Sequence, residues 1–232
     1  MIIDFEDTKC EMGVKEILKQ VIKGEKRILI PLMILSLALI FNFCIGGVSA
    51  ASGDIIYVNG SGGNDSWDGL SAAWISGTTN GPKLSIKNAT GTVNSGGTVN
   101  IANGNYKGIY NTKIIINKDM NIIGQSQTGT IINGTDSAWI FKIQSGVTVA
   151  IKNLTLANGE ADNGGAIYND GSLTITGCNF SDNIVNSTNY LEYPVDGFGG
   201  AIYNNGTLIV DNSNFTSNGA FMVVELSTIP VI

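Results

Sequence analysis

Two stretches of the chain repeat one another and determine its expected fold. The first is GGAIYNDGSLTITGCNFSDN, from Gly164 to Asn183, and the second is GGAIYNNGTLIVDNSNFTSN, from Gly199 to Asn218. Aligned without gaps, the two stretches are identical at 11 of 20 positions. A unit of this length is too short for a domain. It suits one rung of a solenoid, in which each rung packs only on its neighbours.

Apolar and polar residues alternate within each copy. In the first copy the apolar pairs are Ala166 with Tyr168, Leu173 with Ile175, and Cys178 with Phe180, and the second copy keeps the same spacing. Runs with a period of two, separated by Gly and Asn, predict short β-strands joined by tight turns. Stacked rungs place matching residues about 4.8 Å apart. Leu173, Ile175 and Phe180 are therefore expected to fill the interior.

The shared Asn and Gly residues have positions that suit the corners of such rungs. Asn183 and Asn218 end the two copies, where stacked amides are expected to hydrogen-bond as an asparagine ladder. Paired glycines open each copy and allow positive φ and close backbone approach. These glycines are Gly164, Gly165, Gly199 and Gly200.

The same rhythm continues towards the N-terminus. VAIKNLTLANG, from Val149 to Gly159, matches the second half of a copy, and GGTVNIANGNYKG and MNIIGQSQTGTIINGTDSAWIFKI have the pattern of earlier rungs. The two copies start 35 residues apart, which is more than one rung, so residues 184–198 are interpreted as an inserted side loop. Residues 98–218 are expected to form about six rungs, on the order of 30 Å tall.

The motifs also carry a family resemblance. The pairing of GGAI with FxxN, at Gly164 to Ile167 and Phe180 to Asn183, resembles the repeats of chlamydial polymorphic outer-membrane proteins. The order of YVNGSGGNDSWDGLS, GPKLSIKNA, GGTVNIANGNY, IIGQSQTGTIING and the GGAIYN repeats is more similar to adhesin-like surface proteins of methanogenic archaea. The resemblance covers about residues 54–218 and implies an all-β fold, a right-handed parallel β-helix of the pectin-lyase-like type. It implies less about activity, because this fold hosts lyases, hydrolases, tailspikes and adhesins.

The sequence changes character at both ends of the repeats. Residues 51–97 are expected to form an entrance and capping segment, because an open rung exposes unpaired strand edges. The resemblance implies a helix there, and PKLSIKNATGTV places Ile86, Ala89 and Val93 on one helical face. Residues 219–232 lack the glycine pair and the asparagine corner. Two interpretations of them stay open, a truncated array and a final strand that covers the last rung.

The first 50 residues have the features of an export signal. An uncharged run from Ile28 to Ile45 follows Lys23, Lys26 and Arg27, and it precedes the small-x-small sequence Val48-Ser49-Ala50. Residues 28–50 are expected to form a hydrophobic leader helix, either a cleaved signal peptide or a transmembrane anchor, with residues 1–27 on the cytoplasmic side. Met12 is an alternative start to Met1. The protein is thus expected outside the cell or on its surface.

Composition excludes several classes of function. After residue 50 the chain has thirteen acidic and seven basic residues, a net charge of −6, which is the wrong sign for binding nucleic acid. The chain has no His, and Cys178 is the only Cys after residue 50, so an internal disulfide and a Cys–His zinc site are excluded there. No cofactor is expected.

Catalysis is the less favoured prediction. β-Helix enzymes that act on acidic polysaccharide need cations and a base, yet the only Arg is Arg27, in the leader. Hydrolases on this fold need clustered carboxylates, and the weak candidates here are Asp162, Asp170 and Asp182. Their positions at corners are typical of solvated turn residues. The alternative stays a polysaccharide lyase or a glycosidase.

A partial calcium-loop pattern occurs near the start of the repeats. Asn64, Ser66 and Asp68 occupy alternate positions before Gly69, but the closing Glu of an EF-hand loop is missing. Asn64 and Asp68 are therefore weak metal candidates, and a turn is the preferred interpretation.

Surface features favour contact with other molecules. The expected loop contains Tyr190, Tyr193 and Phe198, residue types that stack on sugars or dock protein, although they also pack readily on a core. Asn186 lies in an N-x-S/T sequon and is the glycosylation candidate. We expect an adhesin-like protein whose partners are glycans or proteins of the cell envelope or of a host or neighbouring cell. The membrane is a further partner if the leader is retained, and a nonfunctional fragment of a larger adhesin is the remaining alternative.

Overall fold

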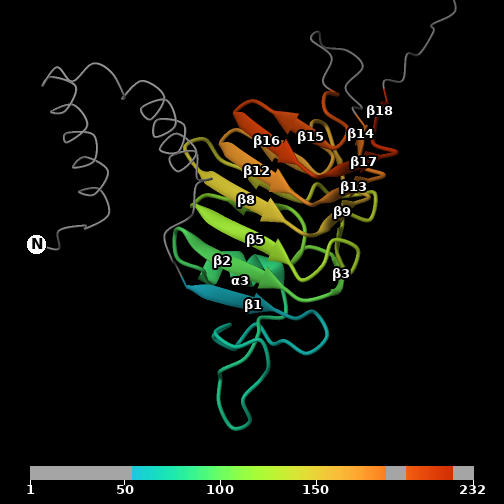
Figure 1. The fold of residues 1–232 in the computed structure, drawn as a ribbon. Coiled ribbons are helices and arrows are strands. Elements are labelled where there is room, and N and C mark those ends of the chain that lie inside the picture. Colours follow the sequence, from blue (N-terminus) through green and yellow to red (C-terminus); the bar gives the residue numbers. More distant parts are fainter. Residues whose placement is uncertain (1–53, 187–196, 222–232) are drawn as a thin grey trace, which may run out of the picture. The chain divides into compact units, whose positions relative to one another are not determined.

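The computed structural model describes residues 54–186 and 197–221, which are almost entirely β-strands and turns (Figure 1). Its elements in chain order are β1 (Ile55–Val58), α3 (Ile86–Thr92), β2 (Gly97–Ile101), β3 (Gly104–Lys107), β4 (Ile114–Ile116), β5 (Met120–Gly124), β6 (Thr130–Asn133), β7 (Phe141–Ile143), β8 (Thr148–Lys152), β9 (Thr155–Ala157), β10 (Glu160–Ala161), β11 (Ile167–Asn169), β12 (Ser172–Thr176), β13 (Asn179–Ser181), β14 (Ile184–Asn186), β15 (Ile202–Asn204), β16 (Thr207–Asp211), β17 (Asn214–Thr216) and β18 (Gly219–Phe221).

These strands form four sheets, named A to D here, and every pairing between them is parallel. Sheet A has the order β1-β2-β5-β8-β12-β16, sheet B β3-β6-β9-β13-β17, sheet C β4-β7-β11-β15, and sheet D β10-β14-β18. The predicted β-rich fold with parallel sheets is therefore confirmed. The hydrophobic leader helix expected over residues 28–50 lies outside the described residues.

Consecutive strands visit the sheets in cyclic order. From β2 the chain passes through sheets A, B and C and returns to A, and from β9 onward it adds a short strand in sheet D between B and C. One such passage is called a rung below. Figure 1 shows the strands of sheet A lying one beside the next in sequence order, from β1 to β16.

The two repeated stretches occupy neighbouring rungs in register. Leu173 pairs with Leu208, and Phe180 pairs with Phe215. The two phenyl rings stack with their centroids 4.6 Å apart and their planes 2° from parallel. Residues that match in the sequence repeat are therefore neighbours in space, so each rung covers its successor with the same side-chain shapes.

The interior is one continuous apolar cluster. On sheet A, one interior row runs through Ile56, Val99, Ile122, Ile151 and Ile175, all of which are buried. β-Branched side chains pack well on a pleated surface, which explains why Ile and Val dominate these positions. The alternate positions of the same strands point outward and form the outer face of sheet A.

A short helix closes the first rungs. α3 begins after Ser85, whose hydroxyl accepts a hydrogen bond from the backbone N–H of Asn88. Ile86, Ala89 and Val93 are fully buried, and the helix packs against β1 and β2. Ser85 is held in turn by Asp65, whose carboxylate accepts bonds from the backbone N–H and the hydroxyl of Ser85.

At the start of each copy, the structure does not have the predicted alternation of inward and outward side chains. Ala166 and the next residue, Ile167, are both fully buried, whereas Tyr168 lies on the outer surface of sheet C. The corner formed by Gly164 and Gly165 ends only one residue before β11. The period-two pattern therefore begins at Ile167, and Ala166 belongs to the corner.

The segments expected as a loop and as an atypical end both begin with strands. Ile184–Asn186 forms β14, which pairs with β10 and β18, and Val185 is fully buried. The insertion therefore starts after Asn186, and residues 187–196 lie outside the described residues. Gly219–Phe221 forms β18, so the last rung continues past Asn218. Three-residue strands are too short for their alternation to be distinguished from a loop in the sequence.

The last described rung is more exposed than the one before it. Val210 and Phe215 are 43% and 44% exposed, whereas their partners Ile175 and Phe180 are fully buried. Within residues 54–186 and 197–221, no helix has the length and apolar character needed to cross a bilayer.

Candidate contact surfaces

The three candidate catalytic carboxylates occupy three different corners of one rung. Asp162 follows β10 of sheet D, Asp170 follows β11 of sheet C, and Asp182 follows β13 of sheet B. Asp182 has a left-handed backbone with φ of 55°, and the Asp170 carboxylate accepts a hydrogen bond from the amide of Asn205 at 3.1 Å. These carboxylates therefore lie at separate corners with at least one strand between them, whereas hydrolysis requires a close pair.

The candidate metal residues are engaged in turns. The side-chain oxygen of Asn64 accepts bonds from the backbone N–H and the hydroxyl of Ser66, at 2.9 and 2.8 Å. Asp68 accepts a bond from the backbone N–H of Leu70 at 2.9 Å. In the described part of the chain, no three acidic or thiol side chains gather as a metal site would require.

Asn183 and Asn218 form a hydrogen-bonded ladder. The Asn183 amide donates to the side-chain oxygen of Asn218 at 2.9 Å and to the carbonyl of Leu156 at 3.0 Å. The Asn183 oxygen accepts from the N–H of Gly159 at 2.9 Å, and Asn218 donates to the carbonyl of Phe180 at 2.9 Å. Each amide thus joins its own corner to the backbone of the neighbouring rung or strand.

A second asparagine ladder was not predicted from the sequence. The amide of Asn169, which is fully buried at the end of β11, donates to the side-chain oxygen of Asn204 at 2.6 Å and to the carbonyl of Thr207 at 3.0 Å. Asn204 donates in turn to the carbonyl of Gly206. The shared YN of the two copies was the available signal, because an Asn repeated at an interior position needs partners there.

The paired glycines stand where the backbone of adjacent rungs meets. Gly164 and Gly199 have positive φ of 67° and 71°. A Cβ on Gly165 would lie 2.5 Å from the carbonyl oxygen of Ile184 and still closer to that of Gly200. These positions are structural, since they exclude any side chain.

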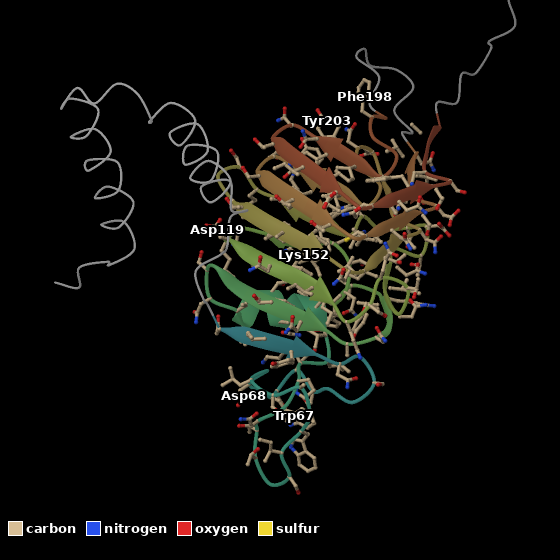
Figure 2. The ribbon with its side chains drawn as sticks, in the orientation of Figure 1. Trp67, Asp68, Asp119, Lys152, Phe198 and Tyr203 are labelled. Atoms are coloured by element: carbon tan, nitrogen blue, oxygen red, sulfur yellow. The ribbon has the colours of Figure 1, made fainter. Side chains whose placement is uncertain are left out.

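Of the predicted contact loop, Tyr190 and Tyr193 lie outside the described residues. Phe198 is 60% exposed, and its backbone is held by Asn163 and by the N–H of Gly164. The glycosylation candidate Asn186 is exposed at the end of β14, and its amide donates to Glu160 at 3.1 Å. Figure 2 shows Phe198 and Tyr203 at the same end of the sheets, far from Trp67 at the opposite end.

An outward column of side chains crosses sheet C. Lys142, Tyr168 and Tyr203 are in register on three adjacent strands. The Lys142 ammonium lies 4.6 Å from the Tyr168 ring centroid, and the two tyrosine rings are 4.9 Å apart. Partial burial raises the pKa of Tyr168, as do the charge of Asp170 and the neighbouring Tyr203. Lys142 and Tyr203 cover the two faces of the Tyr168 ring, so Tyr168 presents only its edge to a ligand. Tyr203 lies on the last strand of sheet C and has one ring face without such a neighbour in that sheet.

A groove of about 500 Å³ lies on the outer side of sheet A, at the end of the strands of the first rungs; we call it the sheet A groove. Its lining residues are Tyr57, Val58, Asn59, Ala72, Asn100, Ile101, Ala102, Ile123, Gly124 and Gln125. Tyr57, Asn100 and Ile123 are in register on β1, β2 and β5 and point outward. Ala72 comes from the long connection between β1 and α3, which forms the other wall.

The sheet A groove combines an aromatic ring with amides and has no charged side chain in its lining. The oxygens of Asn59 and Gln125 accept bonds from neighbouring backbone N–H groups, at 3.1 Å from Ser61 and 2.9 Å from Asn103, which leaves their NH₂ groups as donors. The next outward residue in the row, Lys152, follows Ile123 in register. Asp119 precedes β5, at the other end of the strands, where it accepts a bond from the N–H of Thr148 (Figure 2).

The sequence did not identify this groove because its residues are far apart in the chain. Tyr57 and Asn100 become neighbours only through the register of β1 on β2. Comparisons of the chain with family models, with curated proteins and with solved structures find no match, so the proposals below depend on the residues of the chain itself.

Proposed function

We propose that the rungs form a right-handed parallel β-helix and that the protein is a non-catalytic, adhesin-like binding protein exported to the cell surface. The cyclic order of parallel strands supports the architecture, since a parallel return to the same sheet is right-handed in nearly all folds. The motif order that resembles archaeal surface proteins and the uncharged run from Ile28 to Ile45 support the location. The partners are glycans or proteins of the envelope or of a neighbouring or host cell.

We further propose that the sheet A groove binds a neutral carbohydrate, and its uncharged lining carries this proposal. The apolar face of a sugar ring stacks on an aromatic side chain such as Tyr57. Hydroxyl groups exchange hydrogen bonds with amides such as Asn100, which donate and accept at once. A uronate or sulfated sugar would need a cationic partner, and no Lys or Arg lines the groove.

Binding without turnover is consistent with the chemistry of the lining. General acid–base catalysis needs a titratable side chain within hydrogen-bond reach of the reacting bond. The groove offers Tyr57 as its one ionisable side chain, and Asp162, Asp170 and Asp182 lie on other corners.

A glycan array probed with the full chain in mild detergent tests the proposal. We expect binding to neutral oligosaccharides, weakened at least about tenfold by Tyr57→Ala and by Asn100→Ala. Tyr110→Ala and Asn105→Ala are matched controls, since both residues are exposed outside the groove. Binding that is indifferent to Tyr57 would assign the ligand to another surface. Release of new reducing ends from any polymer would show an enzyme instead.

A further inference from the structure

The connection between β1 and α3 carries an exposed apolar cluster that the sheet A groove does not use. Leu70 is 56% exposed, and Trp74 and Ile75 are each 50% exposed. The segment from Gly69 to Pro82, called the apolar loop here, contains no charged residue. Figure 1 shows the connection extending away from the sheets on the far side of β1.

The loop is held in this exposed arrangement by internal bonds. The backbone N–H groups of Asp68 and Gly69 donate to the carbonyls of Thr79 and Gly81, which closes its base. The Trp67 and Trp74 rings stack with centroids 5.7 Å apart and planes 5° from parallel. Large apolar side chains that are held outward on one short loop favour a contact site, because water solvates them poorly.

The chemistry of the loop favours lipid over a glycan. The indole N–H of Trp74 donates to the carbonyl of Thr78 at 3.0 Å, and the Thr78 hydroxyl donates to the carbonyl of Ile75 at 2.8 Å. These polar groups are thus used internally, whereas a sugar site must offer them to hydroxyls. Aliphatic side chains beside a Trp are typical of surfaces that enter the boundary between headgroups and acyl chains.

Charges near the loop do not oppose such a contact. The Asp68 carboxylate accepts bonds from the N–H groups of Leu70 and Gly81, at 2.9 and 3.3 Å, and so lies at the base of the loop. The tip therefore enters an apolar medium without desolvating a charge, a step that would be costly.

The position of the loop along the chain also suits a membrane. The apolar run of the sequence ends at Ile45, ten residues before Ile55 of β1. Ten residues span at most about 35 Å, so a membrane that holds this run lies within that distance of Ile55, which begins the strand directly before the apolar loop. We propose that the apolar loop inserts Leu70, Trp74 and Ile75 into a lipid surface and turns the β1 end of the protein towards it.

Fluorescence quenching by brominated phosphatidylcholine tests this in the full chain reconstituted in vesicles. The three tryptophans are Trp67, Trp74 and Trp139, so Trp67→Phe with Trp139→Phe leaves Trp74 as the sole reporter. Trp67→Phe with Trp74→Phe leaves Trp139, which lies between β6 and β7, as the matched control. We expect Trp74 to be quenched at least about threefold more than Trp139. Equal quenching of the two reporters would overturn the proposal.

A second variant pair keeps the native tryptophans and avoids dependence on the Trp67 stack. Leu70→Asn with Ile75→Asn should remove most of the lipid quenching, whereas Ile109→Asn with Ile115→Asn should leave it unchanged. Ile109 and Ile115 are 65% and 55% exposed outside the loop. Quenching that persists in the first variant would also overturn the proposal. So would protection of Trp74 from acrylamide by a neutral oligosaccharide and not by lipid, which would assign the loop to glycan binding.

Discussion

Phe180 and Phe215 occupy the same position in the two sequence copies, yet the structure predicts unequal costs when each is replaced by Ala. Phe180 is fully buried between Leu156 and Phe215, whereas Phe215 is 44% exposed. Truncation of a buried Phe to Ala costs about 3–5 kcal/mol, because the transfer free energy of the removed ring is lost and a cavity is left behind. Phe215 has roughly half of its surface in solvent already, so its truncation should cost about 2 kcal/mol.

Urea unfolding of the full chain in mild detergent, followed by far-ultraviolet circular dichroism, measures both costs. We expect Phe180→Ala to lower the free energy of unfolding by about 2 kcal/mol more than Phe215→Ala does. The double variant should show a coupling of about 0.5–1.5 kcal/mol, because the rings stack at 4.6 Å. Equal losses would refute the reasoning, since they would mean that the last rung is as well covered as the one before it.

Three further predictions concern the corners, the helix and the interior thiol. Asn183→Ala should cost about 1–3 kcal/mol in the same unfolding assay, because it leaves the buried backbone N–H of Gly159 without its acceptor. A cost no larger than that of the exposed Asn105→Ala would contradict the ladder. Gly165→Ala should prevent stable folding, because its Cβ would clash with the carbonyl of Ile184. Gly91→Ala in α3 places its Cβ in open space and should raise the free energy of unfolding by about 0.5–1 kcal/mol. The opposite ranking of the two variants would be inconsistent with both environments. Burial raises the pKa of the Cys178 thiol above its ordinary 9.0, so the thiol ionises at a lower pH in the unfolded chain than in the folded one. The free energy of unfolding that the neutral thiol contributes below pH 9 should therefore decline as the pH rises above 9. If the stability of a Cys178→Ser chain declines equally in urea titrations, the thiol is not the cause.

Much of the fold was predictable because the repeat places identical residues in neighbouring rungs. The pairing of Leu173 with Leu208 and of Phe180 with Phe215 follows from a gapless alignment once parallel stacking is assumed. The helix over Ile86–Thr92 was also expected, since Ile86 and Ala89 share a face. In these cases local periodicity and tertiary packing agree.

The details that escaped prediction depend on where corners begin and end. The outward position of Tyr168 follows from a corner that includes Ala166, and alternation alone did not indicate this shift. β14 has only three residues, too few to show a period. The sheet A groove is built from Tyr57, Asn100 and Ile123, which come together only through register across three rungs.

Distances between spin labels along the outer row of sheet A test the central claim, parallel rungs stacked in register, most directly. The row runs Tyr57, Asn100, Ile123, Lys152, Thr176 and Asp211. With the native cysteines replaced by Ser, labels at Asp211 and Asn100 should lie about 19 Å apart, and labels at Asp211 and Tyr57 about 24 Å apart, at about 4.8 Å for each strand crossed. A separation that fails to grow from the first pair to the second, or one well beyond these lengths, would contradict the stacking of the rungs.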